Sequence, residues 1–455
     1  MSIPAPRTDA VLLAGLGMLA VLAGLLAGVD GRLAILAALG VAFVLIAFAD
    51  LPFGLAIFMF LGFIVVVPNF AGETLSIIKL AAVPLLLSWL AFVSLEGTAG
   101  RNFIVAHPAA SVLMMLFLGW ALLSVLWAED QTAVLTAVFR YGLAVALVLV
   151  VFTAVQKERD VMLIVVAMVL GAVGAAVYGF LNPAPAEFGQ VQRLSGTLGN
   201  ANELARALVL GVGLSGSLFV IAKTALGRGA ALGAGGLCLI AIFLTGSRGG
   251  LISLAAMLIA AVVLARGKRL VLTLATLIIV IFAIGYIATA APEQKERFLH
   301  PGSGTGRIDI WTVGGRMVEA EPVSGVGAGN FTVSSIHYLL EPGSLPNSQY
   351  IADTPAVAHN MYLEVLAELG FPGAMLFVVL IIFGLGCSIA ALSRFRLSGQ
   401  HRMQALTMAI AVTLIGFLAA DVFASDQYSR ELWLLLGLGP ALLAMAKRME
   451  PDAAA

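Results

Sequence analysis

The chain has very little charge for its length. Only 11% of its 455 residues are Asp, Glu, Lys or Arg, whereas about a quarter of an ordinary soluble protein is charged. This low charge, the 61% hydrophobic content and the mean hydropathy of +1.05 exclude a soluble globular protein. Because 25 Lys and Arg balance 25 Asp and Glu, the chain also lacks the basic surplus of a nucleic-acid-binding protein. We therefore expect a protein that contacts membrane lipids and binds no nucleic acid.

Cysteine and histidine are scarce as well. The two cysteines, Cys238 and Cys387, stand in apolar runs, where neither a disulfide nor a bound metal would find polar support. The five histidines are scattered, and no acidic pair in the loops we assign to the outer side has the spacing of a metal site. We therefore expect no metal and no other cofactor.

Long hydrophobic runs dominate what is present. A spanning helix needs about 20 mostly apolar residues, and about 14 runs approach that length, the two shortest falling below the usual limit. The sequence therefore predicts an all-α polytopic membrane protein with about 12–14 transmembrane helices. The runs are residues 10–29, 33–49, 51–67, 75–94, 109–127, 132–155, 161–181, 204–222, 230–246, 251–265, 270–290, 371–392, 405–425 and 432–446.

Lys and Arg in the short loops predict the orientation of these helices, because such residues concentrate on the cytoplasmic side. They occupy alternate loops, which places both termini in the cytoplasm. The opposite side then receives the turn at 128–130, the stretch 182–203, the turn at 247–248 and one long loop, 291–370. The basic residues used are Lys157, Arg159, Lys223, Arg228, Arg266, Lys268, Arg269, Arg394, Arg396, Arg402, Lys447 and Arg448.

We divide the chain into four segments on this basis. Residues 1–160 hold the N-terminal transmembrane helices, and residues 161–290 hold the central ones with arginine and glycine motifs at their outer ends. Residues 291–370 form the outer loop, and residues 371–455 hold the C-terminal transmembrane helices.

Four arginines lie on the outer side, against the usual distribution of positive charge. They are Arg193, Arg248, Arg307 and Arg316. Guanidinium groups bind phosphate or diphosphate through planar, paired hydrogen bonds, so their convergence favours such a ligand. The alternative is that some of them, Arg316 in particular, only form surface ion pairs with nearby glutamates.

Further charges fall within or at the edge of the apolar runs: Lys79, Arg140, Arg206 and Asp421. Charges at membrane depth are costly and usually face a cavity or a partner. Arg206 has an alternative explanation, because an arginine near a helix end can extend its head to the lipid head groups.

The stretch 196–202, GTLGNAN, combines turn-forming glycines with the polar side chains of Asn200 and Asn202. A helix that starts near Asn202 would direct its first amides toward an outer ligand. The glycine-rich stretch 325–329 only superficially resembles a dinucleotide fingerprint, because no strand precedes it.

The outer loop is predicted to carry two amphipathic helices, at 307–320 and 359–370, that rest on the bilayer surface. In the first, Ile308, Trp311, Gly315 and Val318 fall at helical spacing. His359 stands at the start of the second, close to the outer arginines in our interpretation, which favours a general base or hydrogen-bond donor. A structural histidine is the alternative.

These motifs, in this order, resemble the bacterial O-antigen ligase and polysaccharide polymerase family. The matching pieces are GTLGNANELA, TGSRGG, TGRIDIW with PVSGVGAGNF, and AHNMYLEVLAELG. The resemblance implies a GT-C-like membrane glycosyltransferase at the periplasmic face of the bacterial inner membrane. Such an enzyme takes a glycan from an undecaprenyl diphosphate carrier, inverts the anomeric carbon and needs no metal.

The resemblance also implies roles for individual residues. Arg248 and Arg307 would hold the diphosphate, and His359 would take the proton of the acceptor hydroxyl. Asp309 and Glu364 are alternative bases. The expected substrate-binding residues are Arg193, Asn200, Asn202, Arg206, Arg316, Asn360 and Tyr362.

The motifs leave the acceptor open. A ligase would transfer the glycan to a lipid A core, which we favour because the compact loop with its His-Asn helix resembles that branch. A polymerase would transfer it to another carrier-linked repeat unit, and a protein hydroxyl is a third possible acceptor. From a different class, a lipid-glycan transporter or flippase would also explain many helices and membrane-depth charges, although its halves commonly repeat.

Overall fold

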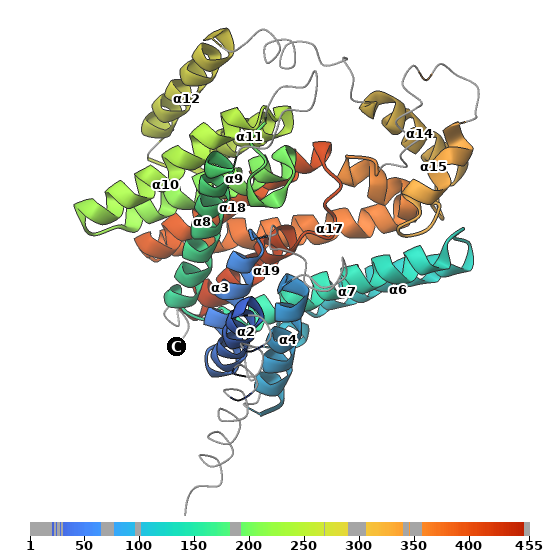
Figure 1. Ribbon diagram of the computed structural model, residues 1–455, viewed down its shortest axis with the longest axis horizontal. Coiled ribbons are helices and arrows are strands. Elements are labelled where there is room, and N and C mark those ends of the chain that lie inside the picture. The colour runs from blue at the N-terminus through green and yellow to red at the C-terminus, as the bar shows by residue number, and fades with distance from the viewer. Residues whose placement is uncertain are drawn as a thin grey trace, which may run out of the picture.

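The computed structural model describes residues 21, 24, 28, 31–64, 77–95, 102–182, 193–267, 269–289, 306–339, 345 and 357–449. Every regular element within these ranges is helical, which confirms the predicted all-α fold (Figure 1). The first predicted run, 10–29, lies outside the described residues apart from three isolated positions.

The long helices begin and end within a few residues of the predicted apolar runs. In chain order the elements are α2 (Gly31–Ala49), α3 (Leu51–Leu61), α4 (Ile77–Leu95), α5 (Phe103–Ala106), α6 (Pro108–Leu123), η1 (Ser124–Leu126), α7 (Gln131–Ala154), α8 (Glu158–Leu181), η2 (Gly196–Leu198), α9 (Ala201–Ile221), α10 (Ala225–Leu244), α11 (Arg248–Leu264), α12 (Arg269–Thr289), α14 (Arg307–Ala320), α15 (Phe331–Leu339), α17 (Met361–Leu397), α18 (His401–Ala420), η3 (Asp421–Phe423) and α19 (Arg430–Arg448).

Nine helices of the described residues are long and apolar enough to cross a membrane. Three shorter apolar helices include most of α2, all of α3 and all of α11. The predicted total of 12–14 transmembrane helices also includes these three short helices and α19. Helix α19 is not among the nine, and its ends carry charged residues. The chain is therefore a polytopic membrane protein in which several helices are shorter than a full span.

Side-chain caps fix where several helices begin. Asp130 caps α7, Asn200 caps α9, Ser247 caps α11 and Asn360 caps α17, each accepting a hydrogen bond from a backbone amide of the first turn. These caps satisfy amides that have no partner inside the helix. They also place the sequence motifs at helix starts.

Helix α19 lies in the core of the bundle and is buried along most of its length. It packs against α7 and α17. Gly439 of α19 and Gly384 of α17 bring the two backbones together, since a side chain at Gly439 would collide with the Gly384 carbonyl. Small residues allow such close approach between membrane helices, where packing rather than water drives association.

Helix α12 lies at the periphery and has no buried residue among those described (Figure 1). Phe243 of α10 contacts Phe282 and Tyr286 of α12, with ring centroids 5.3 and 5.5 Å apart. Its remaining apolar surface faces outward, as expected for a helix solvated by lipid.

Helices α14 and α15 lie at one end of the bundle and pack on the first turns of α17 (Figure 1). A separate small core holds them there, and it contains Ile310, Val313, Met317 and Phe331. The predicted helix at 307–320 is confirmed. Its face with Ile310, Val313 and Met317 packs on α15 and α17, whereas Ile308 is 68% exposed. The predicted contact of this helix with the bilayer surface stays a prediction.

Helix α17 joins the second predicted outer helix to a transmembrane helix through a kink at Gly370 (φ 63°, ψ −174°). The amide of Phe371 donates to the Pro322 carbonyl (2.8 Å), and the amides of Val326 and Gly327 donate to carbonyls of α17 just before the kink (2.9 Å each). The glycine-rich stretch 325–329 therefore braces the kink, which explains its glycines without a nucleotide.

Candidate active site

Arg193 joins the first two sequence motifs. Its Nε donates to the carbonyl of Thr245 (2.7 Å), and its terminal nitrogen donates to Oδ1 of Asn202 (3.0 Å). The backbone runs alongside as well, because the Leu194 amide donates to the Leu244 carbonyl (3.2 Å). Arg193 thus holds the start of α9 against the turn that precedes α11.

Arg248 is the first residue of α11, directly after the capping residue Ser247. Its side chain is half-buried and forms no ion pair or hydrogen bond with another described residue. Gly249 packs against Phe423, and the Phe423 ring lies 6.2 Å from that of Trp311 in α14. Phe423 therefore connects the start of α11, with Arg248, to α14.

Arg307 is the first residue of α14, so it occupies the end of that helix where the partial charge is positive. It is close enough to His359 for its charge to lower the pKa of that histidine. The structure therefore brings Arg307 and His359 together, as the sequence predicts.

His359 lies in a short bend that is held from both sides. Its φ of 49° is the one positive value among non-glycine residues of the described chain. Just before it, Ala358 accepts a hydrogen bond from Trp311 Nε1 (2.9 Å) and donates its amide to Glu364 Oε2 (2.9 Å). Just after it, Asn360 caps α17 by accepting from the amides of Tyr362 and Leu363 (3.1 Å each).

Glu364 extends this support to the segment between α18 and α19. Its carboxylate is buried and accepts hydrogen bonds from Ser425 Oγ and from Gln427 Nε2, the latter at 2.7 Å. The two carboxylate oxygens of Glu364 accept hydrogen bonds from three internal donors. Glu364 is therefore a weak candidate for the catalytic base. Its contacts instead fix the backbone beside His359.

Burial lowers the pKa of His359, and the positive charge of Arg307 lowers it further. Both effects disfavour the imidazolium ion. The imidazole is therefore neutral at neutral pH and can accept a proton.

Three further predicted binding residues, besides Arg193, Asn200, Asn202 and Asn360, also have internal partners. Arg316 donates to the Tyr338 carbonyl at the end of α15 (2.7 Å), and the Tyr362 hydroxyl donates to the Leu418 carbonyl of α18 (2.8 Å). Arg206 forms a buried ion pair with Asp421 (3.0 Å) and a second pair with Asp426. These contacts give each residue a structural role, and their predicted substrate contacts stay predictions.

Sequence reasoning missed Ser425, Gln427 and Trp311 as parts of this site. Ser425 and Gln427 lie in a stretch without a recognisable motif, so no sequence signal connected them to His359. The predicted helix 359–370 carried one sequence signal: Glu364 and Glu368 are four residues apart and so share one helix face, and the structure buries both. Glu368 supports this region too, by accepting from the Phe331 amide (3.3 Å).

The comparisons with known proteins concern the central part of the chain. A family model described as O-Antigen ligase matches residues 233–378. No curated protein matches the chain. The matched residues contain Arg248, Arg307 and His359, whereas Arg193 and Asn202 precede them and Ser425 and Gln427 follow them. The predicted resemblance to the O-antigen ligase family is confirmed over these residues, and the match supports a membrane glycosyltransferase of this kind.

Proposed function

We propose that this protein is a glycosyltransferase that moves a glycan from undecaprenyl diphosphate to an acceptor hydroxyl at the periplasmic face of the inner membrane. We propose an O-antigen ligase with a lipid A core as acceptor, because the matched family carries that description. Both termini would lie in the cytoplasm, and α14 and α15 would cover the active site on the periplasmic side.

In the proposed reaction, the acceptor oxygen attacks the anomeric carbon while His359 takes the proton of that hydroxyl. The bond between the anomeric carbon and the diphosphate oxygen breaks, and its electron pair leaves with the diphosphate. Attack from the opposite side inverts the anomeric carbon. Arg248 and Arg307 stabilise the charge that develops on the diphosphate, so the step needs no divalent cation.

One observation carries the proposal: the half-buried imidazole of His359, whose pKa is lowered by burial and by the charge of Arg307, lies in a loop fixed by Trp311 and Glu364. A base and a cation at adjacent positions suit proton removal next to a departing anion. The two side chains come from different helix starts, so the fold rather than local sequence brings them together.

Purified full-length protein in nanodiscs tests the proposal. It would receive a labelled undecaprenyl diphosphate glycan and a chelator, with and without lipid A core, and product size would be read. Transfer that requires the core supports the ligase. A ladder formed from the donor alone would replace the ligase by a polymerase, and loss of activity with chelator would contradict the metal-independent step.

Matched variants tie the activity to the site. His359→Ala and Arg248→Ala are expected to abolish transfer. His337→Ala and Arg402→Ala serve as controls, because these side chains are exposed and pair with Glu129 and Glu158 elsewhere in the structure. Lipid or sugar that crosses the membrane without transfer would favour a transporter instead.

A further inference from the structure

One aromatic side chain lies between two helix starts of the candidate active site and takes no part in the proposed reaction. Phe423 is the last residue of η3, the single turn that follows α18. On one side it packs on α11 at Gly249, where an added Cβ would lie 3.3 Å from the Phe423 Cβ. On the other side its ring lies 6.2 Å from that of Trp311 in α14, with the two planes tilted by 34°. Phe423 therefore lies between α11 and α14 and contacts both.

Both helices that Phe423 contacts begin with an arginine of the proposed reaction. Arg248 directly precedes Gly249, and Arg307 begins the helix that carries Trp311. A helix start also has a partial positive charge, so the two starts repel each other. Aromatic rings attract one another through packing and need no charge for it. Phe423 and Trp311 can therefore hold the two starts at a fixed separation without a carboxylate that would repel a diphosphate.

Trp311 extends this contact to the proposed base. Its Nε1 donates to the carbonyl of Ala358 (2.9 Å), the residue directly before His359. The same indole thus has its ring beside Phe423 and its N–H on the His359 loop. A change in the packing of Phe423 would therefore move His359 relative to Arg248.

Polar contacts fix the chain on both sides of Phe423. Two residues before it, Asp421 pairs with Arg206 of α9 (3.0 Å). Two residues after it, the Ser425 hydroxyl donates to the buried carboxylate of Glu364 in α17. The backbone at position 423 is therefore held between α9 and α17, and a shorter side chain there would leave a gap.

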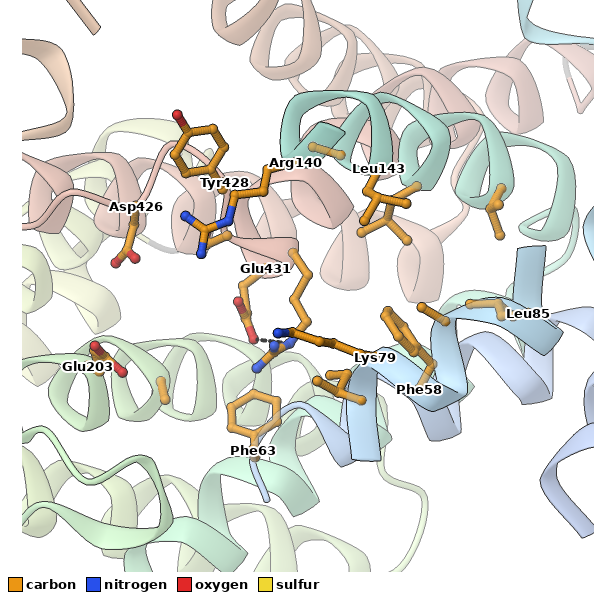
Figure 2. A pocket seen from close by; sticks show the side chains of 18 of the residues that line it. Phe58, Phe63, Lys79, Leu85, Arg140, Leu143, Glu203, Asp426, Tyr428 and Glu431 are labelled. Carbon is orange, nitrogen blue, oxygen red and sulfur yellow. Dashed lines mark ion pairs between the residues drawn. The ribbon is translucent and has the colours of Figure 1, made fainter. Parts of the chain in front are cut away.

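A cavity borders the segment that follows Phe423. Its volume is about 1030 Å³, helices α3, α4, α7 and α9 form its walls, and Asp426 and Tyr428 of the segment line it (Figure 2). The cavity leaves part of this segment without packed neighbours. The position of the segment therefore depends on the contacts of Asp421, Ser425 and Phe423.

We propose that Phe423 is a positioning residue that sets the separation between Arg248 and His359. The inference rests on the proposed function, in which Arg248 holds the leaving diphosphate while His359 takes the proton of the acceptor. Both groups must face the same anomeric carbon, so their separation affects the rate. Phe423 lies outside residues 233–378, so the match to the O-antigen ligase model does not include it.

Kinetics of the full-length protein in nanodiscs test this role. Phe423→Ala removes the ring, so kcat should fall about 100-fold, the effect of a displacement of about 1 Å at a reacting group. KM for the glycan donor should stay unchanged, because Phe423 does not touch the substrate in this proposal. Phe423→Tyr keeps the ring and should keep the wild-type kcat. Phe282→Ala is the matched control, because it removes one ring of an aromatic pair between α10 and α12, and it should also keep the wild-type kcat.

A distance measurement tests the same role without a substrate. Nitroxide labels at Ile252→Cys in α11 and Glu319→Cys in α14 report the separation of these helices by double electron–electron resonance. Both positions are exposed, and the two native cysteines are buried. Phe423→Ala should broaden the distance distribution, whereas Phe423→Tyr and Phe282→Ala should not. Phe423→Leu keeps much of the apolar volume and takes the place of Phe423→Ala if that protein does not fold.

The two measurements separate this inference from the proposed function. If the wild type transfers no glycan but Phe423→Ala broadens the distribution, the proposed reaction fails and the spacing role of Phe423 is supported. An unchanged distribution in a folded Phe423→Ala protein, or an equal broadening in Phe282→Ala, would overturn the inference. A raised KM with an unchanged kcat in Phe423→Ala would also overturn it, because Phe423 would then contact the substrate.

Discussion

His359 adopts a backbone conformation that few residues other than glycine adopt. Such a conformation costs about 1–3 kcal/mol and persists only where the surroundings enforce it. Here Trp311 and Glu364 hold the peptide before it, and the Asn360 cap holds the helix after it. The histidine is thus placed by its neighbours rather than by its own preference.

The lowered pKa of His359 predicts the pH dependence of transfer. A general base must be neutral, and the neutral fraction falls only when the pH falls through the lowered pKa. The wild-type kcat/KM should therefore stay constant down to about pH 6.5, the ordinary pKa of histidine, and decline below it. Arg307→Gln removes a charge that disfavours the imidazolium, so the residual activity should decline at a higher pH than in the wild type.

The kcat/KM profile of both proteins between pH 4.5 and 8.5 checks this prediction. A profile of Arg307→Gln that moves to lower pH would contradict the assigned effect of the Arg307 charge. The His337→Ala protein is the control and should keep the wild-type profile.

Glu364 is expected to act as a positioning residue. Glu364→Ala leaves Ser425, Gln427 and the Ala358 amide without their acceptor, and a displacement of about 1 Å at a reacting group can lower a rate about 100-fold. We expect kcat to fall about 100-fold. KM, and the pH below which kcat/KM declines, should stay unchanged. Glu319→Gln, which changes an exposed side chain on α14, is the control. If Glu364→Ala raised KM and left kcat unchanged, Glu364 would have a substrate-binding role instead.

At the scale of elements, the transmembrane helices were predictable because the bilayer demands long apolar runs and internal backbone hydrogen bonds. The start of α9 was also predictable, because Asn200 supplies a recognisable cap. The short helices α5 and α15 were not, since a run of four to nine residues carries too few turns to show a period. For α14 the helix was predicted correctly, but its packed face depends on α15 and α17, which local sequence does not specify.

The candidate site, like the helices, has residues that the sequence could suggest and residues that it could not. Arg248, Arg307 and His359 could be proposed from the sequence because each interrupts an apolar or glycine-rich stretch, and their roles stay predictions. The contacts of Ser425 and Gln427 with Glu364 join positions about 60 residues apart, so only the folded chain reveals them.

The kink in α17 predicts a stability effect. Gly370 has a positive φ, and a side chain there would collide with the Val323 carbonyl. Gly370→Ala should therefore destabilise the protein by about 1–3 kcal/mol or more. Thermal unfolding in detergent measures this loss as a lower Tm.

Gly386→Ala is the matched control for the kink, because Gly386 lies in the same helix with open space around it. Alanine favours a helix over glycine, so the Tm of this variant should not fall. Equal Tm values for the two variants would show that the kink tolerates a side chain.

At the scale of the whole molecule, the pair of Arg206 and Asp421 joins α9 to the end of α18. Asp421 is fully buried, and removing one partner of a buried pair costs about 3–5 kcal/mol. Arg206→Gln should therefore lower the Tm strongly, and adding Asp421→Asn should restore much of it. We expect transfer to recover with stability, because two carboxylates already engage the Arg206 guanidinium.

The exposed pair of Arg402 and Glu158 provides the control. Arg402→Gln should change stability by about 1 kcal/mol or less, since water screens such pairs. A double variant of Arg206 and Asp421 that is stable but inactive would instead support the substrate contact that the sequence predicts for Arg206.

The contacts of Arg193 with Thr245 and of Gln427 with Glu364 have a consequence for engineering. The residues matched by the family model are held in shape by neighbours that precede and follow them in the chain. A chimera that exchanges residues 233–378 alone would separate donors from their acceptors at both boundaries. A chimera that exchanges substrate specificity between related proteins must therefore exchange residues 193–202 and 421–431 together with the matched segment.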